Sequence, residues 1–177
     1  MVCSKCKSAD HNVAKCTAVP EKVEILIPEE DGKKLVELVR TVKRVGNELK
    51  KGRKEGVYQN AICHELQDMG VKYTREEVMP ITYKGRFVGE ERLDIVLNSY
   101  LDVIFELKSV ASEIKAENHW QVLSYMNYKN YKYGFVVNYN QSHAKGLMID
   151  ILVRQDEKMY LLDLDEGTGI ELEDYSY

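Results

Sequence analysis

The sequence predicts a mixed α/β fold, in which helices flank a mixed β-sheet, preceded by a small zinc-binding segment. Short β-branched and aromatic runs alternate with helical patterns, four metal-ligand side chains lie within the first sixteen residues, and 177 residues suit one domain with a modest appendage. The expected organisation is a zinc-binding segment at 1–16, a linker at 17–34, an α/β domain at 35–163 and an acidic tail at 164–177.

The helical patterns predict three helices, at Lys33 to Lys50, Glu55 to Met69 and Ala116 to Asn127. The first has a single apolar stripe, and the second ends at Gly70, a common C-terminal signal. Strands are expected at Val23–Ile27, Val71–Val78, Ile81–Tyr83, Gly89–Asn98, Leu101–Val110, Lys132–Asn138, Gly146–Arg154 and Met159–Asp163. The Val23–Ile27 strand is expected at a sheet edge.

Two successive strands carry an unusual set of charged side chains. Asp94 lies in the first strand, and Glu106 and Lys108 lie in the second, after a turn expected at Asn98–Ser99. Strand alternation places Glu106 and Lys108 on one face, and pairing across the turn brings Asp94 towards it. We therefore expect two carboxylates and one ammonium group to converge.

These residue types suit phosphodiester hydrolysis. Two carboxylates bind Mg²⁺ or Mn²⁺, which lowers the pKa of bound water, while Lys108 orients that water or stabilises the developing anion. The alternative is a hairpin with solvated Asp94 and Glu106 side chains that pair with Lys108. The apolar run Val103–Lys108 favours the site, because unpaired charge in such a run is costly.

These residues resemble a known family. Asp94, Glu106 and Lys108 match the core motif of the PD-(D/E)XK nucleases, with Leu93 in place of the usual proline. Gly52 to Tyr58 reads G-x-x-E-x-x-Y and resembles the GxxExxY branch of that superfamily. Further landmarks in the same order are Glu65-Leu66, Tyr83-Lys84-Gly85, Gly89, His119-Trp120-Gln121, Tyr125 and Gly134 to Asn138.

The resemblance covers roughly residues 35–153 and implies a restriction-endonuclease-like sheet and a metal-dependent nuclease. It implies that Asp94 and Glu106 are metal ligands, that Lys108 assists the water, and that Gln121 faces the site from a downstream helix. Glu55 would be an additional acid from the helix that begins there. Glu55 could instead be a solvated residue favoured by the helix dipole, and Gln121 a surface residue.

Charge is distributed unevenly, although the net charge of −4 alone favours no partner. Residues 33–54 contain nine Lys or Arg and two Glu, whereas residues 156–177 contain eight acidic residues and one Lys. The basic segment could follow a phosphate backbone, or it could be a solvated helix face. The candidate nucleic-acid contacts are Lys43, Arg44, Lys50, Lys51, Arg53 and Lys54.

The amino terminus has the spacing of a CCHC zinc knuckle. Cys3, Cys6, His11 and Cys16 are spaced C-x2-C-x4-H-x4-C and suit one tetrahedral Zn²⁺. The loops between these ligands contain no aromatic residue, so base stacking by the knuckle is left open. Cys63 is expected in the core, and reduced cysteines suit an intracellular protein of the cytoplasm or nucleus.

Two other groups of residues have alternative interpretations. The segment with Tyr125, Tyr128, Tyr131 and Tyr133 is expected to pack in the fold rather than to stack on bases. His119 is either a proton shuttle or a structural imidazole, and Tyr58 is expected in the core.

The sequence thus predicts a Mg²⁺- or Mn²⁺-dependent nuclease that acts on DNA or RNA. The alternative is a catalytically inactive nuclease fold that binds nucleic acid or protein through the knuckle, and a third reading is a knuckle-mediated protein adaptor. No apolar stretch is long enough to span a membrane, and we expect no signal peptide.

Overall fold

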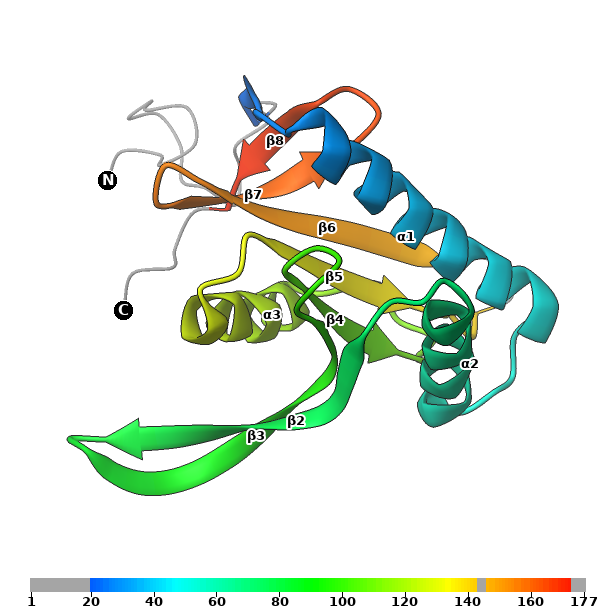
Figure 1. The fold of residues 1–177 in the computed structure, drawn as a ribbon, viewed down its shortest axis with the longest axis horizontal. Coiled ribbons are helices and arrows are strands. Elements are labelled where there is room, and N and C mark those ends of the chain that lie inside the picture. Colours follow the sequence, from blue (N-terminus) through cyan, green and yellow to red (C-terminus); the bar gives the residue numbers. More distant parts are fainter. Residues whose placement is uncertain (1–19, 143–145, 173–177) are drawn as a thin grey trace, which may run out of the picture.

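A computed structural model describes residues 20–142 and 146–172 (Figure 1). In this part of the chain, one sheet of eight strands has the order β1-β8-β7-β6-β5-β4-β3-β2. The helices are α1 (Glu29–Leu49), α2 (Glu55–Asp68) and α3 (Ala116–Lys129). The strands are β1 (Lys22–Glu24), β2 (Tyr73–Tyr83), β3 (Arg86–Leu97), β4 (Val103–Lys108), β5 (Tyr133–Asn138), β6 (Met148–Gln155), β7 (Lys158–Asp163) and β8 (Thr168–Glu171). The four cysteine and histidine residues of the predicted knuckle lie outside the described residues.

The sheet is mixed, because β4 and β5 are parallel whereas the other neighbouring strands are antiparallel. Parallel strands need a crossover, and α3 supplies it between β4 and β5. Helices α1 and α2 pack on one face and α3 on the other, which makes three layers (Figure 1). The prediction of a mixed sheet flanked by helices is therefore confirmed.

Each face of the sheet has its own apolar core. On the α1 and α2 face, Leu38 and Ile62 belong to the same buried cluster as Phe105. On the α3 face, Val122 belongs to a second cluster with Ile104. Since successive residues of β4 point to opposite faces, this strand contributes to both cores.

Helix α1 begins at Glu29, before the predicted start at Lys33. Pro28 precedes it, and Glu29, Glu30 and Asp31 form an acidic first turn that interacts favourably with the helix dipole. The apolar stripe that predicts this helix begins only at Leu35, so the sequence pattern missed its first turn.

The hairpin of β2 and β3 projects from the body of the molecule as a long arm (Figure 1). The sequence predicted two strands where β2 is one, because Pro80 marked a break; β2 is an edge strand, where proline is tolerated. Lys84 and Gly85 form the turn, with φ values of 51° and 75°. Both residues are left-handed, as a two-residue hairpin turn requires.

Two connections differ from the prediction. Residues 98–102 form a loop between β3 and β4 rather than a tight Asn98–Ser99 turn, since strand pairing ends at Leu97 and Val103. Strand β8 lies within the segment expected to be an acidic tail, and it pairs with β7 and β1. Within the described residues, no helix is both long and apolar enough to cross a membrane.

Candidate active site

Strand β4 places Glu106 and Lys108 on the face that α3 covers. Phe105 and Leu107 point to the α1 and α2 core, while Ile104 points to the α3 core. The alternation of the strand therefore directs the side chains of Glu106 and Lys108 towards α3. Glu106 is only 2% exposed although its side chain is a carboxyl group.

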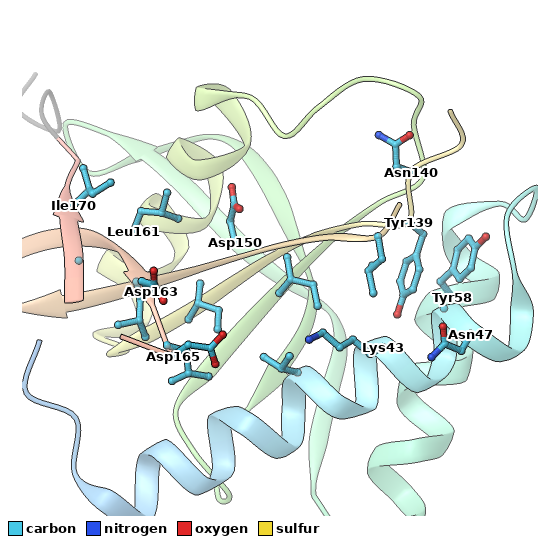
Figure 2. Close-up of a pocket in the computed structure, with 18 of the residues that line it drawn as sticks. Lys43, Asn47, Tyr58, Tyr139, Asn140, Asp150, Leu161, Asp163, Asp165 and Ile170 are labelled. Atoms are coloured by element: carbon cyan, nitrogen blue, oxygen red, sulfur yellow. The ribbon is translucent and has the colours of Figure 1, made fainter. Parts of the chain in front are cut away.

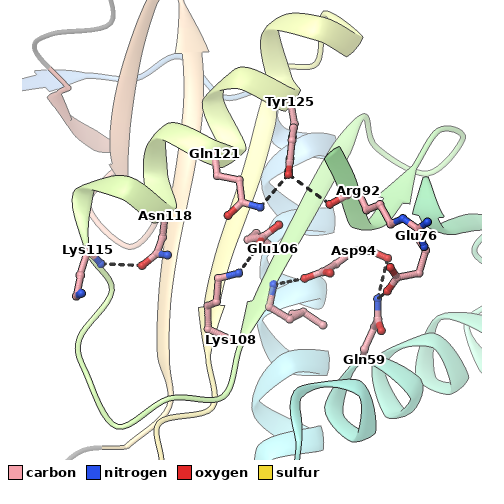
Figure 3. A network of polar contacts seen from close by, with 11 residues as sticks. Gln59, Glu76, Arg92, Asp94, Glu106, Lys108, Lys115, Asn118, Gln121 and Tyr125 are labelled. Carbon is pink, nitrogen blue, oxygen red and sulfur yellow. Dashed lines mark hydrogen bonds and ion pairs between the residues drawn. The ribbon is translucent and has the colours of Figure 1, made fainter. Parts of the chain in front are cut away.

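Strand β3 brings Asp94 beside Glu106, as Figure 3 shows. The register pairs Ile95 with Phe105, so the preceding residue of β3 lies next to the following residue of β4. Oδ2 of Asp94 accepts a hydrogen bond from the backbone N–H of Leu107 at 2.7 Å. We call Asp94 and Glu106 the carboxylate pair.

Burial makes the carboxylate pair hard to ionise. Burial, reinforced by the charge of Asp94, raises the pKa of Glu106 to about 7. Burial likewise raises the pKa of Asp94 to about 6, against the opposing effect of the Leu107 amide, and the Glu55 carboxylate adds to the rise. The site therefore gains from any cation that offsets these charges.

Lys108 supplies part of that positive charge. Its Nζ donates a hydrogen bond to Oε1 of Glu106. Burial acts to lower the pKa of Lys108, but Glu106, Glu55 and Asp94 together raise it, so the net pKa is above its usual value. Lys108 is consequently an ammonium ion at neutral pH and acts as a charge and hydrogen-bond donor, not as a base.

The other oxygen of Glu106 suggests where a metal fits. Among the described residues, Oε2 of Glu106 is a buried side-chain atom with no hydrogen-bond partner. Such an atom is costly to bury unless it binds a donor or a cation. The described residues contain no group of three or more His, Cys, Asp and Glu arranged to hold a metal. Two carboxylates are nevertheless sufficient for Mg²⁺, which keeps water and substrate phosphate oxygens as its other ligands.

Helix α2 contributes from the side of the carboxylate pair. Glu55 lies in its first turn, close enough to raise the pKa of both Asp94 and Glu106. One turn later, Nε2 of Gln59 donates to the backbone carbonyl of Asp94 at 3.0 Å and to Oε1 of Glu76 at 2.8 Å. Gln59 thereby ties α2 to β3.

Sequence reasoning missed Gln59 and Glu76. A signal existed for Gln59, because it follows Glu55 by four residues and so shares its helix face. No pattern in the sequence identifies Glu76. In the structure its φ is 49°, in the left-handed region, and backbone strain of this kind concentrates at functional sites.

Helix α3 covers the carboxylate pair with a short hydrogen-bonded chain (Figure 3). Nε2 of Gln121 donates to the hydroxyl of Tyr125 at 2.8 Å, and that hydroxyl donates to the backbone carbonyl of Arg92 at 3.3 Å. Burial raises the pKa of Tyr125, and the nearby Glu106, Glu91 and Asp94 charges add to this rise. Gln121 therefore lies on the side of α3 that faces Glu106 (Figure 3).

The predicted basic contacts occupy three different places. Lys50, Lys51, Arg53 and Lys54 lie in or beside the exposed loop between α1 and α2. This loop reaches the end of β4, since Ser109 Oγ donates to the carbonyl of Arg53 at 2.7 Å. Arg44 instead forms an ion pair with Glu65 at 2.6 Å. Lys43 lines a pocket on the other side of α1, and Lys50 and Lys51 of the loop line this pocket as well.

That pocket has a volume of about 880 Å³ and lies between α1 and strands β6 to β8 (Figure 2). Its lining includes Val39, Leu147 and Ile151 together with Lys43 and Asp163, but not the carboxylate pair or Lys108. It opens on the α1 side of the sheet, opposite α3. Asp94, Glu106 and Lys108 are therefore not in this pocket, despite its size.

The structure bears on four further expectations, which concern Cys63, Tyr58, His119 and the tyrosine segment. Cys63 and Tyr58 are buried, as predicted, and Tyr58 donates to the carbonyl of Lys50 at 2.6 Å. His119 joins α3 to β6 through a contact of 2.7 Å between Nε2 and Asp150 Oδ2, which favours its structural reading. The tyrosine segment packs at Tyr125, Tyr131 and Tyr133, whereas Tyr128 is exposed.

Comparison with protein families supports the class of protein that this fold and site suggest. A model of the PD-(D/E)XK nuclease superfamily matches residues 33–151, which is more than half of the chain. The chain therefore belongs to the PD-(D/E)XK nuclease superfamily. Members of this superfamily are generally hydrolytic nucleases that act on nucleic acid and typically use divalent metals such as Mg²⁺. No curated protein and no solved structure was found to match.

Proposed function

We propose that this protein is a metal-dependent nuclease that hydrolyses phosphodiester bonds of DNA or RNA. The observation that carries the proposal is the buried Oε2 of Glu106, which has no hydrogen-bond partner among the described residues and belongs to a carboxylate beside Asp94. A buried carboxylate oxygen without a partner destabilises a purely structural hairpin, whereas a bound cation would offset that cost.

In this proposal, Asp94 and Glu106 hold Mg²⁺ or Mn²⁺. When bound, the metal would lower the pKa of its water ligand and neutralise negative charge that develops on the phosphate. Lys108 keeps its proton and donates hydrogen bonds to the attacking water or to the developing anion. Glu106 orients Lys108 through Oε1, so the strand fixes both groups relative to each other.

The remaining residues have supporting roles. Glu55 adds a third negative charge near the metal ligands, from the first turn of α2. Gln121 is held by Tyr125 and presents its amide beside the site. The basic loop that contains Lys50, Arg53 and Lys54 ends next to Glu55 and supplies contacts to substrate phosphates.

The proposal also places the chain in the GxxExxY branch of the superfamily. The motif runs from Gly52 to Tyr58 and joins the basic loop to α2. Gly52 has a φ of 93°, which disfavours other residues, Glu55 lies near the carboxylate pair, and Tyr58 anchors the loop through Lys50. Each fixed letter of the motif thus has a physical reason.

For the amino terminus we propose a structural Zn²⁺ bound by Cys3, Cys6, His11 and Cys16. The test is the zinc content of the purified chain. One Zn²⁺ per chain that is lost in Cys6→Ser supports the knuckle, and a wild-type chain without zinc contradicts it.

The nuclease proposal is tested by incubating the full chain with labelled single- and double-stranded DNA and RNA, with Mg²⁺ or Mn²⁺. Asp94→Asn and Lys108→Ala should lower cleavage at least about 100-fold, the usual loss for a group that stabilises the transition state. Lys33→Ala is the matched control, because Lys33 is exposed and, among the described residues, its ion pair is with Glu29 in the first turn of α1. If the folded wild type cleaves none of these substrates, the inactive binding module replaces the nuclease.

A further inference from the structure

Trp120 is the only tryptophan of the chain, and it is 47% exposed. It lies in α3, next to Gln121 in sequence and five residues before Tyr125. It lines a pocket of about 500 Å³ between α3 and β3, which we call the Trp120 pocket. Trp120 thus presents a large aromatic face beside the proposed active site, on which a flat group can stack.

The Trp120 pocket adjoins the proposed site of hydrolysis. Gln121 and Tyr125 belong to both, because they line the pocket and form the chain that covers the carboxylate pair. Arg92 of β3 forms the other wall, two residues before Asp94. Its backbone carbonyl accepts a hydrogen bond from the Tyr125 hydroxyl. A group in this pocket would therefore belong to the same substrate molecule as the phosphate that is cleaved.

Charge decides which part of a nucleic acid fits there. Glu91 and Glu117 both line the pocket, from β3 and from α3. Arg92 lines it too but pairs with Glu90 at 3.6 Å, and Glu117 pairs with Lys115 at 3.4 Å. The carboxylates disfavour a phosphate but accept hydrogen bonds from the amino groups of a base. The face of Trp120 offers a stacking surface, and every base has a π-face.

We propose that the Trp120 pocket holds an unpaired nucleobase of the substrate, stacked on Trp120 and hydrogen-bonded to Glu91 or Glu117. This inference rests on the proposed nuclease function and narrows its substrate class to nucleic acid with single-stranded or unpaired bases beside the cleaved bond. Cytosine and adenine should bind better than thymine or uracil. The latter two have no amino group, and their one ring N–H lies between two carbonyl oxygens that face the carboxylates unfavourably.

Because Trp120 is the sole tryptophan, its fluorescence reports on this pocket directly. The full chain is titrated, without added Mg²⁺ or Mn²⁺, with single-stranded oligomers of dC, dA or dT and with an abasic oligomer of equal length. We expect strong quenching by the dC and dA oligomers, weaker quenching by dT and none by the abasic backbone. Equal quenching by the abasic oligomer, or no quenching by any bound oligomer, would overturn the proposal.

Variants separate stacking from a structural role. Trp120→Ala should weaken binding of a labelled dC oligomer about fivefold to 100-fold, the usual worth of one stacked base, whereas Trp120→Phe should retain most of the affinity. Tyr128→Ala is the matched control, because Tyr128 is also an exposed aromatic residue of α3 but does not line the pocket. Unchanged affinity of Trp120→Ala, with folding checked by thermal unfolding, contradicts the proposal.

The two proposals fail in different ways. Cleavage by the wild type without a contribution from Trp120 leaves the nuclease and removes the base pocket. If dC oligomers quench the fluorescence and Trp120→Ala loses binding, but no metal supports cleavage, the base pocket stands and the protein is an inactive binding module. A chain that binds none of these oligomers and cleaves neither DNA nor RNA, single- or double-stranded, overturns both.

Discussion

The carboxylate of Asp94 caps the backbone amide of Leu107 across two strands, with an Oδ2 to N distance of 2.7 Å. Backbone pairing between β3 and β4 ends at Ile95 and Phe105. Beyond that pair, the Asp94 side chain accepts the hydrogen bond of the Leu107 amide. An asparagine can accept the same hydrogen bond through its amide oxygen. The charge at this position can thus be removed while the strand contact is kept.

Asp94→Asn should therefore stabilise the metal-free protein at about pH 8. The pKa of Asp94 is raised to about 6, so its ionised form costs folding free energy, on the order of 1–2 kcal/mol after allowance for partial exposure. Urea unfolding measures the difference. Asp94→Ala, which also loses the bond to Leu107, should be less stable than Asp94→Asn, and the reverse order would show that the charge is not the costly element.

Stability of the metal-free wild type should fall as pH rises from about 4 to about 7. Both carboxyls of the pair have raised pKa values in the folded state, so the folded chain holds protons that the unfolded chain has already released. Their contribution to stability is greatest below the unfolded pKa values and is lost as pH rises through the folded ones. Urea unfolding of the wild type and of Glu106→Gln across this range checks it, since the variant should show a weaker fall.

Binding of Mn²⁺ should show the opposite pH dependence. Protons compete with the metal for Glu106, whose pKa is raised to about 7. The increase in unfolding temperature caused by Mn²⁺ should therefore be larger at about pH 8 than at about pH 6. An increase that is equal at both pH values, or that persists in Glu106→Gln, would place the metal elsewhere.

Gly134→Ala should destabilise the fold by about 1–3 kcal/mol, the usual cost of overpacking. A Cβ on Gly134 would lie 2.4 Å from Cγ1 of Val122 and 2.8 Å from Sδ of Met126. Helix α3 would have to move away from β5, which would also shift Gln121 and Tyr125. Gly56→Ala is the control, since nothing lies within 4 Å of its added methyl group, and denaturant midpoints compare the two.

Replacing both Arg53 and Lys54 by alanine should weaken nucleic-acid binding and reduce its salt dependence. Each phosphate contact contributes about 0.9 to the slope of log K against log salt on duplex DNA, so the loss should approach about 2. The control is the double variant Lys33→Ala and Arg40→Ala, which lie on α1 and pair with Glu29 and Glu37. Equal slopes in both double variants would show that the basic loop does not follow the backbone.

Local patterns predicted most of the elements correctly, but edges and connections depended on longer-range contacts. Thr168–Glu171 has an acidic surrounding sequence, yet it pairs as β8 because β7 and β1 offer partners on both sides. Pro80 breaks a strand in a local reading, but it is tolerated at the open edge of β2. Sheet position is a property of the whole fold, and no window of sequence contains it.

The sequence by itself determined the mixed α/β class and the candidate residues Asp94, Glu106 and Lys108, because strand periodicity and the spacing of charged residues are local. Only the tertiary structure decided that Glu106 is buried with one oxygen that has no partner in the described part of the chain, and that Gln59 joins Glu76 to the Asp94 carbonyl. It also decided that Trp120 lines a pocket beside Gln121. Burial and convergence arise where α2, α3 and β3 meet β4, and these elements are far apart along the chain. Chemistry of the residue types can be read locally, whereas the pKa of each group depends on neighbours that folding brings together.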